Sequence, residues 1–115
     1  MEYVLLIQGN GPGYAALSAQ EIDKLYAGHH ELMTALKEAG VGLPYSAELQ
    51  DPTSARIVRP AGGDWLLTDG PFTETKEQLG GFYVIDVPDM DTAVTWAKRI
   101  PVIPGDAIEV RPAKG

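Results

Sequence analysis

The chain of 115 residues contains no cysteine. This absence excludes disulfide frameworks, thiolate zinc sites, iron–sulfur clusters and cysteine nucleophiles. A chain of this length accommodates one domain, which we expect to cover residues 1–115. Hydrophobic residues make up 44% of the chain and charged residues 22%, so a folded globular domain is expected instead of a disordered or fibrous chain.

Basic residues are scarce, and their longest run is Lys98-Arg99. Nine Lys and Arg face sixteen Asp and Glu, which gives a net charge of −7. Such a surface repels nucleic-acid phosphates and anionic lipid headgroups. No basic leader follows Met1, and no apolar run approaches the ~20 residues of a membrane span. We therefore expect a soluble, cytoplasmic protein that binds neither nucleic acid nor membrane.

The first 40 residues predict a strand followed by a long helix. Residues 3–8 are apolar and end at a glycine-rich segment, 9–13, which predicts a surface loop because it lacks phosphate-binding motifs. Ser18 and Glu21 form a capping box for a helix that should end before Gly40. Its apolar face consists of Ile22, Leu25, Tyr26, Leu32, Met33 and Leu36. His29 falls near the middle of that face, where the helix should meet a sheet.

The remaining segments alternate between strand and helix patterns. We expect a strand over 41–49, a hairpin from 54–59 and 64–68, a strand at 82–85, a helix from Asp89 to Ile100 and a strand at 107–111. This order indicates an α+β, ferredoxin-like βαββαβ fold with an antiparallel sheet and both helices on one face. The other face then lacks a cover, and a second copy of the chain would supply it. We expect a homodimer.

Residues 68–82 form the most unusual segment. Asp69-Gly70-Pro71 predicts a rigid turn, which is either structural or part of a ligand-binding loop, and Phe72 would anchor it. Thr75 to Gln78 has the pattern of a capped helical turn.

The string Asp69-Gly70-Pro71-Phe72, followed by Glu74, Lys76 and the triplet 80–82, resembles the DGPF family of the YCII-related superfamily. The resemblance extends over nearly the whole chain. It implies a ferredoxin-like fold that dimerises into an α/β barrel, with a cleft between sheet and loops. Members are suspected to be enzymes because of a His–Asp pair, and one relative is a dehydrochlorinase acting on a chlorinated hydroxyquinol. Other relatives occur near sigma factors, which implies a regulatory role.

His29 matches the helix histidine of that superfamily. Asn10 stands where such proteins can carry an acid, so Asp69 is the carboxylate that we expect to orient the imidazole. His29 would move a proton on a small carbon acid or phenol without any cofactor, as in a lyase or isomerase. The ligand-binding candidates are Asn10, Tyr45, Gly70, Pro71, Phe72, Glu74 and Lys76.

Three other interpretations remain open at this point. His29 is a core histidine bonded to a carbonyl; the chain is a non-catalytic module that binds a small molecule or a sigma factor; or it is a cofactor-free monooxygenase. A metal site is not expected, because the adjacent side chains of His29 and His30 diverge by about 100° on a helix.

Overall fold

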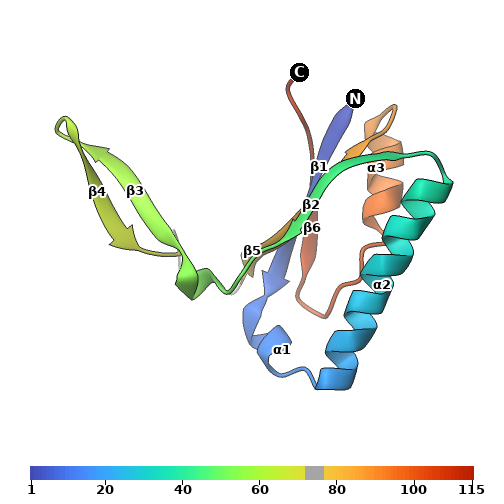
Figure 1. Ribbon diagram of the computed structural model, residues 1–115, viewed down its shortest axis with the longest axis horizontal. Coiled ribbons are helices and arrows are strands. Elements are labelled where there is room, and N and C mark those ends of the chain that lie inside the picture. The colour runs from blue at the N-terminus through green and yellow to red at the C-terminus, as the bar shows by residue number, and fades with distance from the viewer. Residues whose placement is uncertain (72–76) are drawn as a thin grey trace.

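The computed structural model describes residues 1–71 and 77–115. Its main sheet is antiparallel and has the strand order β2 (Gly42–Glu48), β5 (Glu77–Asp86), β1 (Glu2–Asn10) and β6 (Ala107–Pro112). The helices α2 (Ala19–Glu38) and α3 (Met90–Ala97) both lie on one face of this sheet (Figure 1). The units β1–α2–β2 and β5–α3–β6 therefore interlock, and the predicted ferredoxin-like α+β fold is confirmed.

Helix α2 begins and ends where the sequence predicts. The Ser18 hydroxyl accepts a hydrogen bond from the Glu21 N–H at 3.1 Å, and the Glu21 carboxylate accepts one from the Ser18 N–H at 3.0 Å. At the other end Gly40 adopts a φ of 72°, a conformation that glycine tolerates and most residues avoid. None of the helices in the described ranges is long and apolar enough to cross a membrane.

The hydrophobic core lies between the sheet and the two helices. Strand alternation directs Tyr3 and Leu5 of β1, and Tyr83 and Ile85 of β5, toward the helical layer. The other buried apolar residues are Leu32, Leu36, Val87, Ala93, Ala97 and Ile100. Both buried residues of α2 thus belong to its C-terminal half, and its N-terminal half does not seal against the sheet.

The opposite face of the sheet is apolar and carries neither helix (Figure 1). We call it the open face, and its residues are Val4, Leu6, Tyr45, Ala47, Phe82 and Val84. The Tyr45 ring packs against Phe82, with ring centroids 5.8 Å apart, and Tyr45 remains 61% exposed. An uncovered apolar face was the premise of the predicted homodimer, which itself stays a prediction.

The predicted hairpin also forms, but outside the main sheet. After the 3-10 turn η1 (Pro52–Ser54), β3 (Arg56–Ala61) pairs with β4 (Asp64–Asp69) and with no other strand of the described residues. We call residues 56–69 the arm, which projects away from the body on the side opposite the helices (Figure 1). Gly62 and Gly63 turn the chain with φ values of 57° and 86°, as a two-residue hairpin loop requires.

Two local predictions are wrong. The glycine-rich segment is not a loop throughout, because Gly11–Ala15 forms the short helix α1. Asn10 caps this helix by accepting a hydrogen bond from the Gly13 N–H at 3.2 Å, and proline in its first turn supplies helical φ. The helical turn predicted at Thr75–Gln78 also fails in its described part, since Glu77 and Gln78 are the first residues of β5.

We expect Ser18→Ala to lower the free energy of unfolding by about 1 kcal/mol, because the Glu21 N–H loses the hydroxyl that accepts its hydrogen bond. Urea denaturation followed by circular dichroism measures this change. Gln20→Ala, an exposed change in the same first turn, is the control. Equal stability of the two variants would contradict the structural role of the cap.

Candidate functional site

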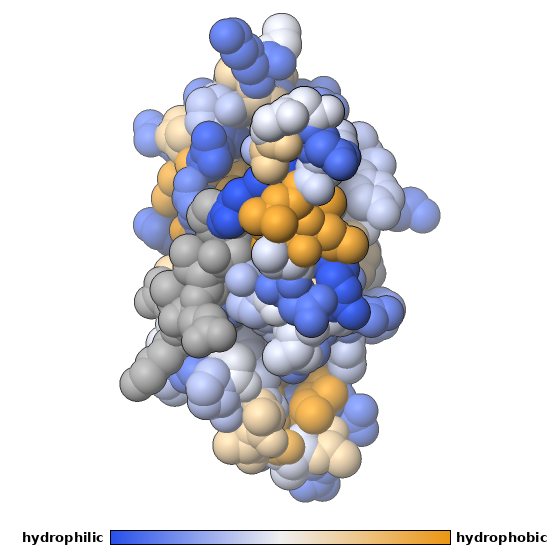
Figure 2. Space-filling model, turned by 90° about the vertical axis from the view of Figure 1, so that its left-hand side faces the viewer, coloured by the Kyte–Doolittle hydropathy of each residue, from blue (hydrophilic) through white to orange (hydrophobic). Residues whose placement is uncertain are grey.

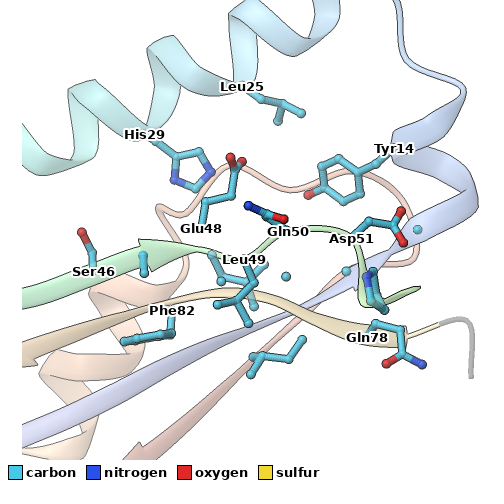
Figure 3. A pocket seen from close by; sticks show the side chains of 18 of the residues that line it. Tyr14, Leu25, His29, Ser46, Glu48, Leu49, Gln50, Asp51, Gln78 and Phe82 are labelled. Carbon is cyan, nitrogen blue, oxygen red and sulfur yellow. The ribbon is translucent and has the colours of Figure 1, made fainter. Parts of the chain in front are cut away.

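A cavity of about 570 Å³ opens where the N-terminal half of α2 stands away from the sheet. Its walls come from β1, α1, α2, the end of β2, η1 and β5 (Figure 3). Most lining residues are apolar, including Ile22, Leu25 and Met33 of α2 and Leu49 after β2. Among the described residues, the ionisable side chains in its lining are those of Tyr14, Tyr26, His29, Glu48, Asp51 and Tyr83. A mainly apolar cavity with a few polar groups is the usual form of a small-molecule site.

His29 lies at the boundary between this cavity and the core. It precedes the buried Leu32 by three residues, so the helix places both on the face toward the sheet. Its Nδ1 lies 2.5 Å from the Tyr83 hydroxyl, and the two rings stack with an interplanar angle of 13°. Tyr83 itself is only 4% exposed. One imidazole nitrogen is therefore engaged by β5, which leaves Nε2 for other partners.

Burial sets the protonation state of both rings. Burial lowers the pKa of His29 below its usual 6.5; the Glu48 carboxylate partly opposes this shift, and His30 adds to it. Burial also raises the pKa of Tyr83 to about 12. At neutral pH the imidazole is therefore uncharged and the phenol is protonated, so a single hydrogen bond between neutral groups joins them.

Glu48, the last residue of β2, faces His29 across the cavity (Figure 3). The Tyr26 hydroxyl lies 2.9 Å from each carboxylate oxygen of Glu48 and donates to them. This hydrogen bond is the main reason that the pKa of Tyr26 is raised. One turn of α2 separates Tyr26 from His29, so the helix supplies the imidazole and also holds the carboxylate that faces it.

A second polar cluster closes the end of the cavity near α1. The Asp106 carboxylate accepts hydrogen bonds from the Asn10 N–H at 2.9 Å, the Ile103 N–H at 3.0 Å and the Tyr14 hydroxyl at 2.5 Å. Burial, followed by the contact with Asp106, raises the pKa of Tyr14, which therefore stays protonated as the donor. These bonds fix α1 against the turn before β6 and hold the Tyr14 ring in the cavity wall (Figure 3).

Of the predicted catalytic residues, only His29 lines the cavity. Asp69 ends β4 on the arm, where its carboxylate lies 3.2 Å from Arg56 Nε. The structure does not bring Asp69 to His29. Within the described part of the chain, Tyr83 holds the imidazole and Glu48 is the facing carboxylate.

The predicted binding residues are scattered. Asn10 caps α1, and its amide also donates to the Pro104 carbonyl at 3.1 Å. Tyr45 lies on the open face. Gly70 and Pro71 stand at the base of the arm, where the Gly70 N–H donates to the Ala55 carbonyl at 2.8 Å. A Cβ at Gly70 would lie 2.9 Å from that of Ala55, so glycine is required there. Phe72, Glu74 and Lys76 lie outside the described residues.

Sequence reasoning missed Tyr83, Tyr14 and the role of Glu48. The signal for Tyr83 was present, because alternation in the strand predicted at 82–85 places residues 83 and 85 on one face, toward the helix that carries His29. The positions of Glu48 and Tyr14 in the cavity depend on how the chain turns after β2 and after β1, which the periodicity of the sequence does not predict. Among the described residues, no three His, Asp or Glu side chains gather as a metal site would need.

Comparison with known proteins places the chain in a family. The family model of the YCII-related domain matches residues 1–114. The chain belongs to the YCII-related family. An uncharacterized protein of Rhizobium meliloti (strain 1021) is 35% identical over 100 residues, which cover 87% of this chain and 80% of that protein. The predicted resemblance is therefore confirmed at the level of the YCII-related family.

We expect the His29 ring to titrate with a midpoint below 6.5 in NMR spectra, with His30→Gln used to assign its signals. Between the lowered pKa and the unfolded value, the unfolded chain binds more protons than the folded one. This contribution to the free energy of unfolding is therefore fully present above pH 6.5 and is lost as the pH falls through the lowered pKa. His29→Gln should remove that pH dependence. A His29 midpoint at or above 6.5 would show that the ring is not desolvated.

Proposed function

We propose that this YCII-related protein belongs to the DGPF group and binds a small, mainly apolar molecule in the cavity. We further propose that His29 moves a proton on that molecule, as in a lyase or isomerase that works without a bound cofactor. The observation that carries the proposal is a half-buried, neutral imidazole in the cavity wall, with one nitrogen held by Tyr83 and a carboxylate opposite.

The chemistry requires one of the two neutral tautomers. With its proton on Nδ1, the ring donates to the Tyr83 oxygen, and the Nε2 lone pair accepts a proton from a carbon acid or phenol. Glu48 then stabilises the imidazolium that forms, which is the role expected of Asp69 from the sequence. The same proton returns to another substrate atom in an isomerisation, or a leaving group departs with the electron pair in an elimination.

The lining also favours one class of ligand. Glu48 and Asp51 add negative charge at the polar side of the cavity, and the chain as a whole carries −7. Anionic ligands such as phosphates are disfavoured there. We expect a neutral or phenolic molecule with an apolar body and one exchangeable proton. A contribution of Gly70, Pro71, Phe72, Glu74 or Lys76 to its binding stays a prediction.

We also propose that the protein is a homodimer, because no described helix packs on the open face and its apolar side chains on β1 and β5 are only partly buried: Val4, Leu6, Phe82 and Val84. Sedimentation velocity should give a mass near twice the 12.4 kDa of the chain. A 12.4 kDa species at all concentrations would contradict the dimer and leave the proposed chemistry of His29 unaffected.

Proton transfer is tested directly by hydrogen–deuterium exchange. A panel of substituted phenols, hydroquinones and cyclic 1,3-diketones is incubated with the protein in D₂O, and NMR follows loss of the exchangeable C–H signals. We expect accelerated exchange for at least one compound and a decrease of about 100-fold or more in His29→Gln, the usual size of a general-base effect. Glu48→Gln should show a smaller loss.

His30→Gln is the matched control, because it alters the exposed neighbour of His29 on the same helix. Its exchange rate should stay close to that of the wild-type protein, because His30 makes the smallest of the contributions to the His29 pKa. The proposal is wrong if His29→Gln retains full exchange activity, or if no compound of the panel shifts the amide signals of α2 and β5.

A further inference from the structure

The arm has one face that is entirely apolar beyond its base. Its strand register pairs Val58 with Leu67 and Pro60 with Trp65, and paired residues of an antiparallel ladder share a face. We call these four residues the arm face. The ion pair between Arg56 and Asp69 marks its inner end. The reverse side of the arm is mixed and includes Arg59, Asp64 and Thr68 beside Ile57 and Leu66. Alternation of this kind is typical of a hairpin that packs on another surface.

The described part of the chain leaves the arm face exposed. Val58 is 60%, Trp65 66% and Leu67 63% exposed. Figure 1 shows the arm standing clear of the main sheet and both helices, and Figure 2 views the molecule from the arm side, where hydrophobic residues gather at the centre. A two-stranded hairpin without such a cover is marginally stable in water, so the arm needs a packing partner.

The overall dimensions exceed those of a compact monomer of the same mass. A compact monomer of 12.4 kDa exposes about 6,100 Å², whereas this chain exposes 7910 Å². The radius of gyration is 16.1 Å, against about 13 Å for a compact domain of this length. The excess surface of about 1,800 Å² is more than twice the roughly 800 Å² that each partner buries in a stable interface.

The arm and the open face both lie on the side of the main sheet away from the helices (Figure 1). In a dimer with twofold symmetry, a contact between the arm of one copy and the second copy is repeated by the arm of the second copy on the first. One chain therefore provides both the arm and the surface that receives it. We propose that the arm of each protomer extends over a second copy of this chain and buries the arm face against it. This proposal goes beyond the proposed reaction and adds a specific contact to the proposed homodimer.

Sedimentation equilibrium over a range of concentrations measures the dimer Kd of three proteins. We expect Leu67→Asp, on the arm face, to raise the Kd at least 30-fold. Leu66→Asp is the matched control, because Leu66 is the exposed neighbour on the reverse side of β4 and should change the Kd less than threefold. Circular dichroism checks that all three proteins are folded.

Fluorescence of Trp65 gives a second measurement that does not depend on a destabilising charge. In a Trp96→Phe background Trp65 is the remaining tryptophan, and its emission should shift to the blue as dimer forms, with the midpoint at the Kd. A dimer in which Leu67→Asp and Leu66→Asp have equal Kd values and Trp65 emission is constant would overturn the arm contact. A monomeric wild-type protein would overturn it as well, and neither result alters the exchange assay of His29.

Discussion

The uneven packing of α2 against the sheet is the constraint on which the site depends. Leu32 and Leu36 seal the C-terminal half of the helix to β1 and β5, whereas the N-terminal half stands over a cavity. His29 lies one turn before the first sealed residue, so it belongs to both regions. A histidine one turn later would be buried in the core, and one a turn earlier would lose Tyr83.

This boundary position explains the electrostatics of the site. Partial burial lowers the pKa of the imidazole, and contact with Tyr83 holds one nitrogen without adding a charge. The carboxylate of Glu48 is placed by a different element and steadied by Tyr26. Helix α2 and strand β2 thus bring the neutral imidazole of His29 and the carboxylate of Glu48 together, although the two residues are far apart in the sequence.

The sequence predicted the fold well because its signals are local. Capping by Ser18, the stop at Gly40 and the alternation in β5 each require only a few neighbouring residues. The site was predicted less well, because periodicity gives the face of an element and not the distance between elements. Asp69 was expected beside His29, but β4 ends on the arm. Helix α1 was missed because the glycines of residues 9–13 favour a loop, and the contacts that hold Asn10 in place, with Pro104 and Asp106, span more than ninety residues.

The segments that connect the arm to the main sheet also form part of the cavity. The chain enters the arm through Leu49 to Pro52 and returns through Gln78 and Leu79, and both stretches line the cavity (Figure 3). The arm is thus attached to the rest of the protein through residues of the cavity wall. A partner that displaces the arm at its entry stretch, Leu49 to Pro52, would also displace the cavity wall that these residues form. For such a partner, binding on the arm and binding in the cavity would alter each other's affinity by the same factor.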